Sequence, residues 1–438
     1  MNLILGKIKK IVKLLSPPQL IALGFAGVIL LGALILMLPI SVREGATVNF
    51  IDALFTSTSA VCVTGLIVID TADHFTVFGR TIVALLIQIG GLGVTCVGVS
   101  LILAARKKVG LKARTLIKES WNISSYQGLV KLVKHVLKIT LIFEFVGMVL
   151  SFIVFVQDFP PLKALGIAAF HSVAAFNNSG FDILGGLTNL IPYQSNLLLN
   201  LVTAGLIIFG GIGFLVIIDV KNKKSFKKLT FHSKAVITMS IFLTVVGTVL
   251  LKMTEDMTWL GAFFHSVSAR TAGFSTYNLG NFTNAGLFVL IILMFIGASP
   301  GSTGGGIKTS TLFVIANVVK SVMTHSHCCA FKRKISESVI MQAFVVTFLS
   351  VMVVCISTFL LTIVEPNYSF IQLFFESTSA FGTVGLSTGI TSHLSSIAKF
   401  IIILTMYVGR LGAMTVATLG AYKEPKTAVY STEDITIG

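Results

Sequence analysis

Four segments of the chain share a pattern of residues that could strip the water from a cation. Each begins with phenylalanine, continues through small and hydroxyl-bearing residues, and ends at a glycine. The copies are FTSTSAVCVTG (55–65), FHSVAAFNNSG (170–180), FHSVSARTAG (264–273) and FESTSAFGTVG (375–385). Backbone carbonyls can replace the hydration shell of an ion where several segments converge on one axis, and glycine permits the close approach this requires. We call these the glycine segments, and together they predict one ion pore.

The composition places the glycine segments in a membrane. Hydrophobic residues make up 54% of the 438 residues, charged residues only 11%, and the mean hydropathy is +0.93. Soluble domains carry about 25% charged residues. The chain is therefore predicted to be an all-α integral membrane protein, because helices satisfy their own backbone hydrogen bonds in lipid.

The formal charge of +16 could suit a protein that binds nucleic acid, but the placement of the basic residues does not. They gather in short blocks between apolar spans: 7–13, 106–118, 131–138, 221–234, 320–334 and 423–426. Basic loops lie on the cytoplasmic side of membrane proteins, where they also offer a surface to a partner or to anionic lipid. No nucleic-acid partner is expected.

Acidic residues occupy the alternate loops. They are Glu44, Asp52, Asp70, Asp73, Asp158, Asp182, Glu255, Asp256 and Glu365. An acidic outer face would raise the local concentration of cations. Equally, the topology could simply tolerate acids outside, and the sequence leaves both interpretations open.

Eight apolar stretches are long enough to cross a bilayer, which takes about 20 residues. They are predicted at 20–39, 76–105, 132–156, 197–220, 235–253, 285–319, 339–364 and 397–421. Each glycine segment falls between the two members of a successive pair and is too short to cross. The expected architecture is four tandem helix–pore loop–helix repeats, with eight transmembrane helices, both termini in the cytoplasm and the loops entering from outside.

The predicted divisions follow from these spans. They are a cytoplasmic interfacial N-terminal helix at 1–15, repeats at 16–118, 119–230, 231–334 and 335–422, and a cytoplasmic tail at 423–438. The first fifteen residues are basic and amphipathic and lack a small-residue cleavage site, so they are interpreted as a helix at the membrane surface and not as a removed signal peptide.

The second helix of the third repeat cannot be continuous. The stretch IGASPGSTGGGIKTST (296–311) interrupts an apolar span with Pro300 and the glycines Gly301, Gly304, Gly305 and Gly306, which break helices. We predict an intramembrane gating loop at 297–308 that includes Lys308. It differs from a phosphate-binding loop because Ile307 separates the last glycine from the lysine.

Arg410 lies where the first and second repeats have Gly91 and Gly211, in the motifs GRLG, GGLG and GGIG. An ionisable residue within a span is a functional candidate. If it faces the pore, it forms part of the gate by repelling cations. Alternatively, carbonyls of the broken helix hold the charge and it has no gating role.

Other charged or metal-like residues have separate interpretations. Arg270 in the third glycine segment is predicted to point behind the pore and to pair with Glu376, as support for the filter. Glu144 is either a proton or sodium ligand or a buried hydrogen-bonded acid, and His171 and His265 are packing or capping residues. The cluster HSHCC (325–329) lacks zinc-ligand spacing, and the five cysteines imply no disulfide framework, so no metal other than K⁺ is expected.

With the four glycine segments, SPGSTGGGIKTS and YVGRLG in this order, the chain resembles the superfamily of Trk, Ktr and HKT potassium transporters, most of all the bacterial KtrB-type membrane subunits. The resemblance implies a K⁺ channel-like fold in pseudo-fourfold arrangement. It further implies a homodimer, a cytosolic ring of nucleotide-binding regulatory subunits, Na⁺-stimulated K⁺ uptake, and a place in the bacterial inner membrane.

The resemblance also assigns the site. The K⁺ selectivity filter would be formed by the last three residues of each glycine segment: Val63, Thr64, Gly65, Asn178, Ser179, Gly180, Thr271, Ala272, Gly273, Thr383, Val384 and Gly385. The gate would be the loop from Gly301 to Lys308, with Arg410 facing it. Each segment has one glycine where the K⁺-channel signature has two, and the third segment is one residue shorter. In some plant relatives, a serine at the first filter glycine accompanies sodium transport, so Gly65 favours potassium.

Two classes of function follow from these residues. The first is an ion-conducting subunit, and the second is an alternating-access carrier, a K⁺/Na⁺ or K⁺/H⁺ symporter. Carriers often have broken helices, but four parallel repeats entering from one side favour a pore. No catalytic set and no cofactor motif is found, so the chain is not expected to be an enzyme, and any nucleotide effect must come through a partner.

Overall fold

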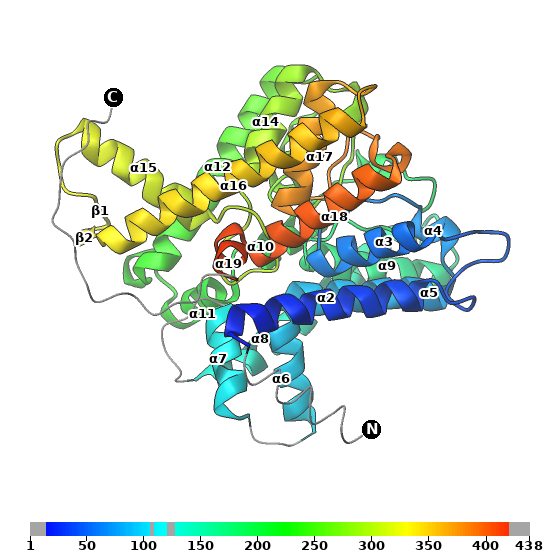
Figure 1. Ribbon diagram of the computed structural model, residues 1–438, viewed down its shortest axis with the longest axis horizontal. Coiled ribbons are helices and arrows are strands. Elements are labelled where there is room, and N and C mark those ends of the chain that lie inside the picture. Colours follow the sequence, from blue (N-terminus) through cyan, green and yellow to red (C-terminus); the bar gives the residue numbers. More distant parts are fainter. Residues whose placement is uncertain (1–14, 106–108, 121–127, 420–438) are drawn as a thin grey trace.

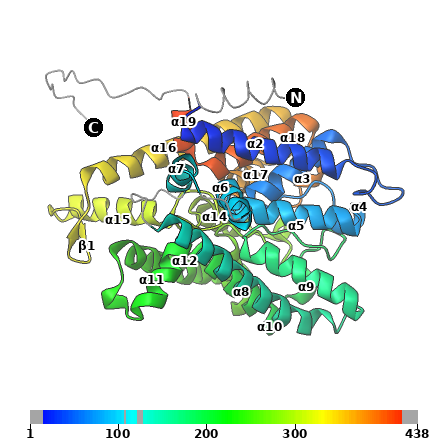
Figure 2. The same ribbon diagram turned by 90° about the horizontal axis from the view of Figure 1, so that it is seen from below.

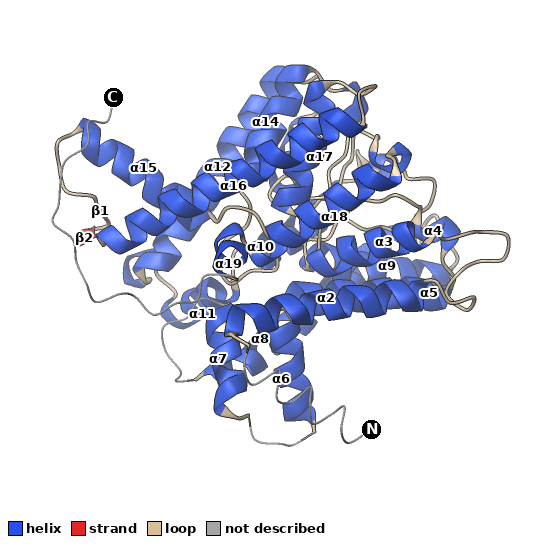
Figure 3. Cartoon of the chain, viewed as in Figure 1, coloured by secondary structure: helices blue, strands red, loops and turns tan. Residues whose placement is uncertain are grey.

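The computed structural model describes residues 15–105, 109–120 and 128–419. The predicted interfacial helix, apart from its last residue, and the predicted cytoplasmic tail lie outside the described residues. Within the described ranges almost all regular structure is helical, and the strands are confined to one hairpin (Figure 3). This agrees with the predicted all-α class.

The helices form four similar units in chain order. Each unit begins with a long helix: α2 (Pro17–Leu36), α8 (Leu129–Phe155), α12 (Phe231–Thr254) and α16 (Glu337–Val364). A short helix from the glycine segment follows: α3 (Phe50–Cys62), α9 (Pro161–Phe176), α13 (Trp259–Ser268) and α17 (Phe370–Gly382). A broken pair ends the unit: α5 (Val77–Leu92) with α6 (Val94–Ala104), α10 (Leu197–Gly211) with α11 (Phe214–Lys223), α14 (Asn284–Phe295) with α15 (Thr309–Met323), and α18 (Ser396–Leu411) with α19 (Ala413–Thr418).

Smaller elements join these helices. They are α4 (Thr71–His74), α7 (Leu111–Ser120), the 3-10 turns η1 (Ile191–Tyr193), η2 (Phe226–Lys228), η3 (Leu279–Asn281) and η4 (Thr391–His393), and the antiparallel strands β1 (Cys329–Ala330) and β2 (Arg333–Lys334). The hairpin lies at the far end of α15 and α16, away from the short helices (Figure 1).

Among the described residues, the long helix of each unit is apolar and long enough to cross a membrane, which gives four spans. Counting each of two bent pairs as one span gives up to six. The spans predicted at 76–105, 197–220 and 397–421 are not single helices, because each is divided into two helices. The chain bends by 98° between α5 and α6 and by 96° between α10 and α11. Helix α18 ends at Leu411, directly before Gly412.

A glycine causes each of these breaks. Gly93, Gly213 and Gly412 have φ values of 84°, 95° and 88°, which residues with a β-carbon rarely adopt and which cannot continue a right-handed helix. The third unit has no helix between Ile296 and Lys308, where the interruption was predicted. The second half of every unit is therefore discontinuous.

The four units close into a ring. Each second helix contacts the short helix of the following unit, in the pairs α5 with α9, α10 with α13, α14 with α17, and α18 with α3. An ion pair joins the last and first units, with Lys399 Nζ 2.7 Å from Asp52 Oδ1. Accordingly, α2 and α18 lie along one side of the molecule and α8 and α10 along the other (Figure 2).

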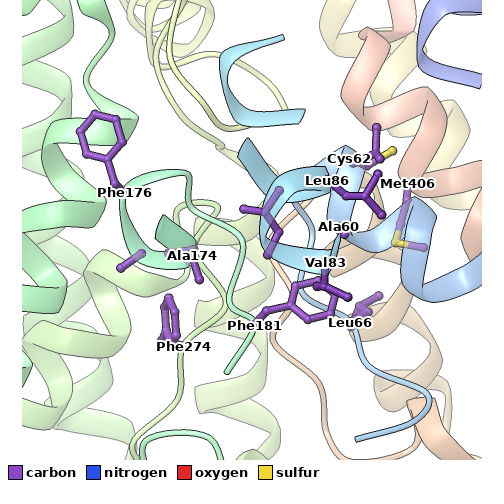
Figure 4. Close-up of a cluster of buried hydrophobic side chains, with 14 of the residues drawn as sticks. Ala60, Cys62, Leu66, Val83, Leu86, Ala174, Phe176, Phe181, Phe274 and Met406 are labelled. Atoms are coloured by element: carbon purple, nitrogen blue, oxygen red, sulfur yellow. The ribbon is translucent and has the colours of Figure 1, made fainter. Parts of the chain in front are cut away.

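The largest buried cluster of apolar side chains surrounds the ends of the short helices. Phe181, which follows the second glycine segment, lies beside Val83 of α5, and Phe274 lies beside Ala174 of α9 (Figure 4). Burying each aromatic ring contributes roughly 2 kcal/mol by the area removed from water. The residues that follow each of these two glycine segments are therefore anchored in the preceding unit.

Candidate functional site

The four glycine segments share an unusual backbone at two positions. The residues two before each glycine are Val63, Asn178, Thr271 and Thr383, with φ values of 58°, 58°, 81° and 50°. The glycines Gly65, Gly180, Gly273 and Gly385 have φ values of 92°, 68°, 77° and 95°. A non-glycine residue in this region costs on the order of 1–3 kcal/mol, so the surrounding packing must hold it there.

The glycines lie against one another in a closed cycle. A β-carbon built on each would fall on a backbone oxygen of the next segment: Gly65 at 2.2 Å from Ser179 O, Gly180 at 2.7 Å from Ala272 O, Gly273 at 2.2 Å from Val384 O, and Gly385 at 2.1 Å from Thr64 O. Real β-carbons do not approach so closely, so only glycine fits. We call these four residues the glycine ring, and it brings together the twelve residues predicted for the filter.

Serine side chains behind the ring hold the segments in place, and sequence reasoning missed them. Ser59 Oγ accepts a hydrogen bond from Gly65 N (3.0 Å) and donates one to Leu66 O (2.8 Å), and Ser379 Oγ accepts one from Gly385 N (3.1 Å). Ser268 Oγ donates to Phe274 O in the third unit. The second unit has Ala174 at this place. The recurrence of serine in three of the four segments was a signal that aligning the copies could have found.

A second recurring contact within the fold explains the paired glycines of the second helices. A β-carbon on Gly90 would lie 2.1 Å from Val61 O, one on Gly210 1.9 Å from Phe176 O, and one on Gly409 2.0 Å from Phe381 O. The first glycine of each motif therefore lets the end of the short helix approach the second helix of its own unit. This is the packing role that small residues have between membrane helices.

A cavity of about 330 Å³ adjoins one end of the glycine ring. Gly65, Gly273 and Gly385 line it together with Asp70 and Asp182. We call it the acidic cavity. Asp182 Oδ1 accepts a hydrogen bond from Leu184 N (3.0 Å), yet burial, assisted by the nearby negative charges of Asp70 and Asp73, raises the pKa of Asp182 to about 7.

The interrupted stretch of the third unit lies at the other end of the ring. Gly305 N donates to Thr383 Oγ1 (3.0 Å), and a β-carbon on Gly304 would lie 2.2 Å from Thr271 Oγ1. A second cavity, of about 210 Å³, is lined by Gly301, Ser302, Gly304, Gly306, Lys308 and Arg410. We call it the loop cavity. The predicted gating residues are thus gathered directly beneath the predicted filter.

Arg410 reaches the loop, as expected from the sequence. Its Nη1 donates to Thr303 O and its Nη2 to Gly90 O. Lys308 Nζ donates to Gly304 O (2.8 Å) and Gly305 O (3.2 Å). Arg410 and Lys308 therefore satisfy backbone carbonyls of the loop and of the broken helix α5 by hydrogen bonds. These carbonyl contacts are the ones that the second interpretation of Arg410 predicts, and they are also compatible with a part in the gate.

The predicted pairing of Arg270 with Glu376 is wrong. Arg270 Nη2 donates to Thr244 Oγ1 of α12 at 2.7 Å, so the side chain runs towards the long helix of its own unit. The Glu376 carboxylate instead accepts hydrogen bonds from the loop that follows its own segment, from Ser387 Oγ (2.6 Å), Thr388 N (3.1 Å) and Thr391 Oγ1 (2.8 Å). Neighbouring glycine segments carry the two residues, but each side chain finds partners within its own unit.

The remaining candidates are held by hydrogen bonds. Glu144 Oε1 accepts from Asn177 Nδ2 (3.1 Å), His171 Nε2 lies 2.9 Å from Thr203 Oγ1, and His265 Nε2 lies 3.1 Å from Ser275 Oγ. Within residues 15–105, 109–120 and 128–419, no three His, Cys, Asp or Glu side chains converge to hold a metal ion.

Comparisons of the sequence and of the structure with known proteins all find cation transport proteins. The family model described as "TrkH: Cation transport protein" matches residues 28–260 and 234–431. The chain is 38% identical to the potassium/sodium uptake protein NtpJ of Enterococcus hirae over 93% of each chain, and 36% identical to the Ktr system potassium uptake protein B of Bacillus subtilis over 97% of each. The solved structure of the potassium transporter TrkH from Vibrio parahaemolyticus superposes with a TM-score of 0.73 at 18% identity, covering 93% of this chain and 85% of that one.

Proposed function

Because the chain belongs to the TrkH family of cation transport proteins, we propose that it is the ion-conducting membrane subunit of a K⁺ uptake system. The resemblance to the Trk, Ktr and HKT superfamily is confirmed by the family match, and family membership makes the chain a transporter and not an enzyme. The names of the two bacterial relatives support K⁺ as the transported ion. The observation that carries the proposal is the closed cycle of backbone contacts in the glycine ring.

In this proposal K⁺ passes through the ring along the axis. The backbone carbonyls of the twelve filter residues replace the water shell of the ion. The two left-handed positions in each segment give its peptide groups orientations that a regular strand or helix does not have, and carbonyls can thereby point towards the axis. The serines behind the ring and the buried aromatic anchors resist collapse when the ion leaves. The acidic cavity faces the outside and the loop cavity faces the cytoplasm, with both chain termini cytoplasmic.

We propose that the loop from Gly301 to Lys308 closes the path below the ring and that Arg410 holds it closed. Hydrogen bonds from Arg410 and Lys308 to loop carbonyls support this assignment. The glycines supply the freedom to leave this position, since none of Gly301, Gly304, Gly305 and Gly306 has a side chain to be moved. Release of the Arg410 contacts would clear the path.

Other parts of the proposal rest on the resemblance and on the relatives. They are stimulation by Na⁺, a homodimer, a cytosolic nucleotide-binding regulatory ring, and the bacterial inner membrane. The name of the Enterococcus hirae relative includes sodium, and the basic blocks offer a cytoplasmic surface for a regulatory partner and for anionic lipid. The alternating-access symporter is less well supported, because a closed ring of contacts among all four units resists the rocking of one half against the other.

Transport by the purified protein tests the proposal. In proteoliposomes the protein should take up K⁺ at least roughly tenfold faster than Na⁺ at equal gradients. A site with a fixed number of coordinating carbonyl oxygens favours K⁺, the larger of the two ions. In Gly65→Ser, K⁺ uptake should fall and the preference for K⁺ over Na⁺ in the remaining uptake should narrow, because the new β-carbon would lie 2.2 Å from Ser179 O. Equal movement of K⁺ and Na⁺ by the unaltered protein would overturn the potassium assignment.

A further inference from the structure

Two buried carboxylates from different units face the acidic cavity. Asp70 precedes α4 in the first unit and Asp182 follows Gly180 in the second, and each residue is only 8% exposed. The two loops are joined directly, since Leu187 N donates to Asp70 Oδ2 at 2.7 Å. A charge at this place lies just beyond the ring, on the path that an ion from the outside would take.

A hydroxyl group in the same wall has no hydrogen-bond partner. Thr71 lines the acidic cavity, is 1% exposed, and its Oγ1 contacts no donor or acceptor in the part of the chain that the structure describes. A buried hydroxyl without a partner is costly, and a bound ion or water would satisfy it. It adds a neutral oxygen beside the two carboxylates, and such hard oxygen ligands suit alkali and alkaline-earth cations.

No fixed positive charge pairs with these carboxylates in the described ranges. The charges of Asp70 and Asp73 act on Asp182, and Tyr277 and His393 line the same cavity. His74 and Arg80 lie next to Asp70, and Arg43 lies close to Arg80. The Arg80 guanidinium donates to Ala72 O, a backbone carbonyl, and its charge acts on Asp70 and Asp73 without a direct ion pair. The carboxylates of Asp70 and Asp182 that line the cavity therefore have no directly bonded cationic side chain in the described ranges, and a mobile cation can bind them.

We propose that the acidic cavity holds a monovalent-cation site, in which the carboxylates of Asp182 and Asp70 and the hydroxyl of Thr71 bind K⁺ before it enters the glycine ring. The inference rests on the proposed function, since it adds a binding step to the same path. Asn189 couples this site to the ring, because its Nδ2 donates both to Asp182 Oδ2 (3.1 Å) and to Gly180 O (3.2 Å). The site loads the ring with ions from dilute solution.

Protons compete with K⁺ for this site. Burial places the pKa of Asp182 at about 7, above its ordinary value. Below that pH the carboxyl group is mostly protonated and neutral, so K⁺ binds weakly. Above it the carboxylate forms, and the affinity for K⁺ rises until deprotonation is complete.

The test measures how the KM for external K⁺ depends on external pH in proteoliposomes, with ⁸⁶Rb⁺ as tracer. For a competing proton with this pKa, the KM of the unaltered protein should fall roughly tenfold between about pH 6 and about pH 8. Asp182→Asn should have a KM that does not change with pH and is at least as high as that of the unaltered protein at the lower pH. Glu44→Gln is the matched control: it removes an exposed acid that does not line the acidic cavity, and its profile should follow the unaltered protein.

The other outcomes of these measurements separate the proposed cation site from the proposed function. If Asp182→Asn keeps the pH dependence of the unaltered protein, the site is refuted while K⁺ transport stands. If low concentrations of Ca²⁺ block K⁺ uptake and the block disappears in Asp182→Asn, the site is divalent and the inference fails. If Asp182→Asn moves no K⁺, Asp182→Glu decides, since active transport with a pH-dependent KM supports the carboxylate and its absence refutes it. Failure of the unaltered protein to move K⁺ would refute the proposed function itself.

Discussion

Replacing Gly385 by alanine is expected to lower K⁺ uptake at least a hundredfold. The new β-carbon would lie 2.1 Å from Thr64 O, at the contact where the fourth glycine segment meets the first. Relief requires backbone movement of roughly an ångström, and a displacement of this size at a site that binds an ion costs roughly two orders of magnitude in rate. Initial rates of ⁸⁶Rb⁺ uptake in proteoliposomes, normalised to incorporated protein, measure the loss.

Gly389→Ala separates crowding from backbone strain. Gly389 has the same φ value as Gly385, 95°, but nothing lies within 4 Å of the position that a β-carbon would occupy there. The left-handed conformation should cost about 1–2 kcal/mol of stability in both variants. Only Gly385→Ala should lose transport. Equal losses in the two variants would show that strain, and not contact within the ring, sets the effect.

Deleting Gly304, Gly305 and Gly306 is expected to raise K⁺ flux roughly tenfold or more. The loop they belong to contacts the predicted filter residues Thr271 and Thr383, and a shortened loop could not reach these residues. Arg410→Ala should act in the same direction. A positive charge about 6 Å from a K⁺ ion costs about 3 kcal/mol at an effective dielectric constant of about 20, which amounts to about a hundredfold in occupancy.

Flux through both variants, compared at equal protein content, distinguishes the two interpretations of Arg410. A rise in both supports a gate formed by the loop and the arginine. Unchanged transport in both would leave Arg410 as a charge held by carbonyls, with no part in gating. Lys223→Ala offers a matched control, because it removes an exposed cation of α11 whose partner, Asp219, lies 2.9 Å away and outside both cavities.

Local sequence pattern predicted the features that repeat. The spacing of Phe55, Phe170, Phe264 and Phe375 from their glycines indicated four equivalent segments, and recurrence of a residue type that tolerates positive φ indicated where the segments would meet. The proline and glycines after Phe295 predicted the interrupted helix. These features depend on the backbone conformation of a few consecutive residues, and glycine and proline determine that conformation directly. The crossing of eight spans through a bilayer remains a prediction.

Features that depend on side-chain direction were not predictable in the same way. Arg270 and Glu376 lie in neighbouring glycine segments, but which way each side chain leaves the backbone depends on nearby polar groups such as Thr244 and Thr391. The breaks at Gly93, Gly213 and Gly412 were missed because glycines in an apolar stretch also serve close packing between membrane helices, which does not interrupt a helix.

Locating bound cations in crystals grown with Tl⁺, a K⁺ substitute with strong anomalous scattering, tests the central claim most directly. We expect anomalous density on the axis enclosed by Gly65, Gly180, Gly273 and Gly385, within coordination distance of carbonyls from all four glycine segments. Competition with excess K⁺ should remove it, and competition with Na⁺ should not. Strong density elsewhere in the membrane region, with none inside the ring, would contradict a filter built from these segments.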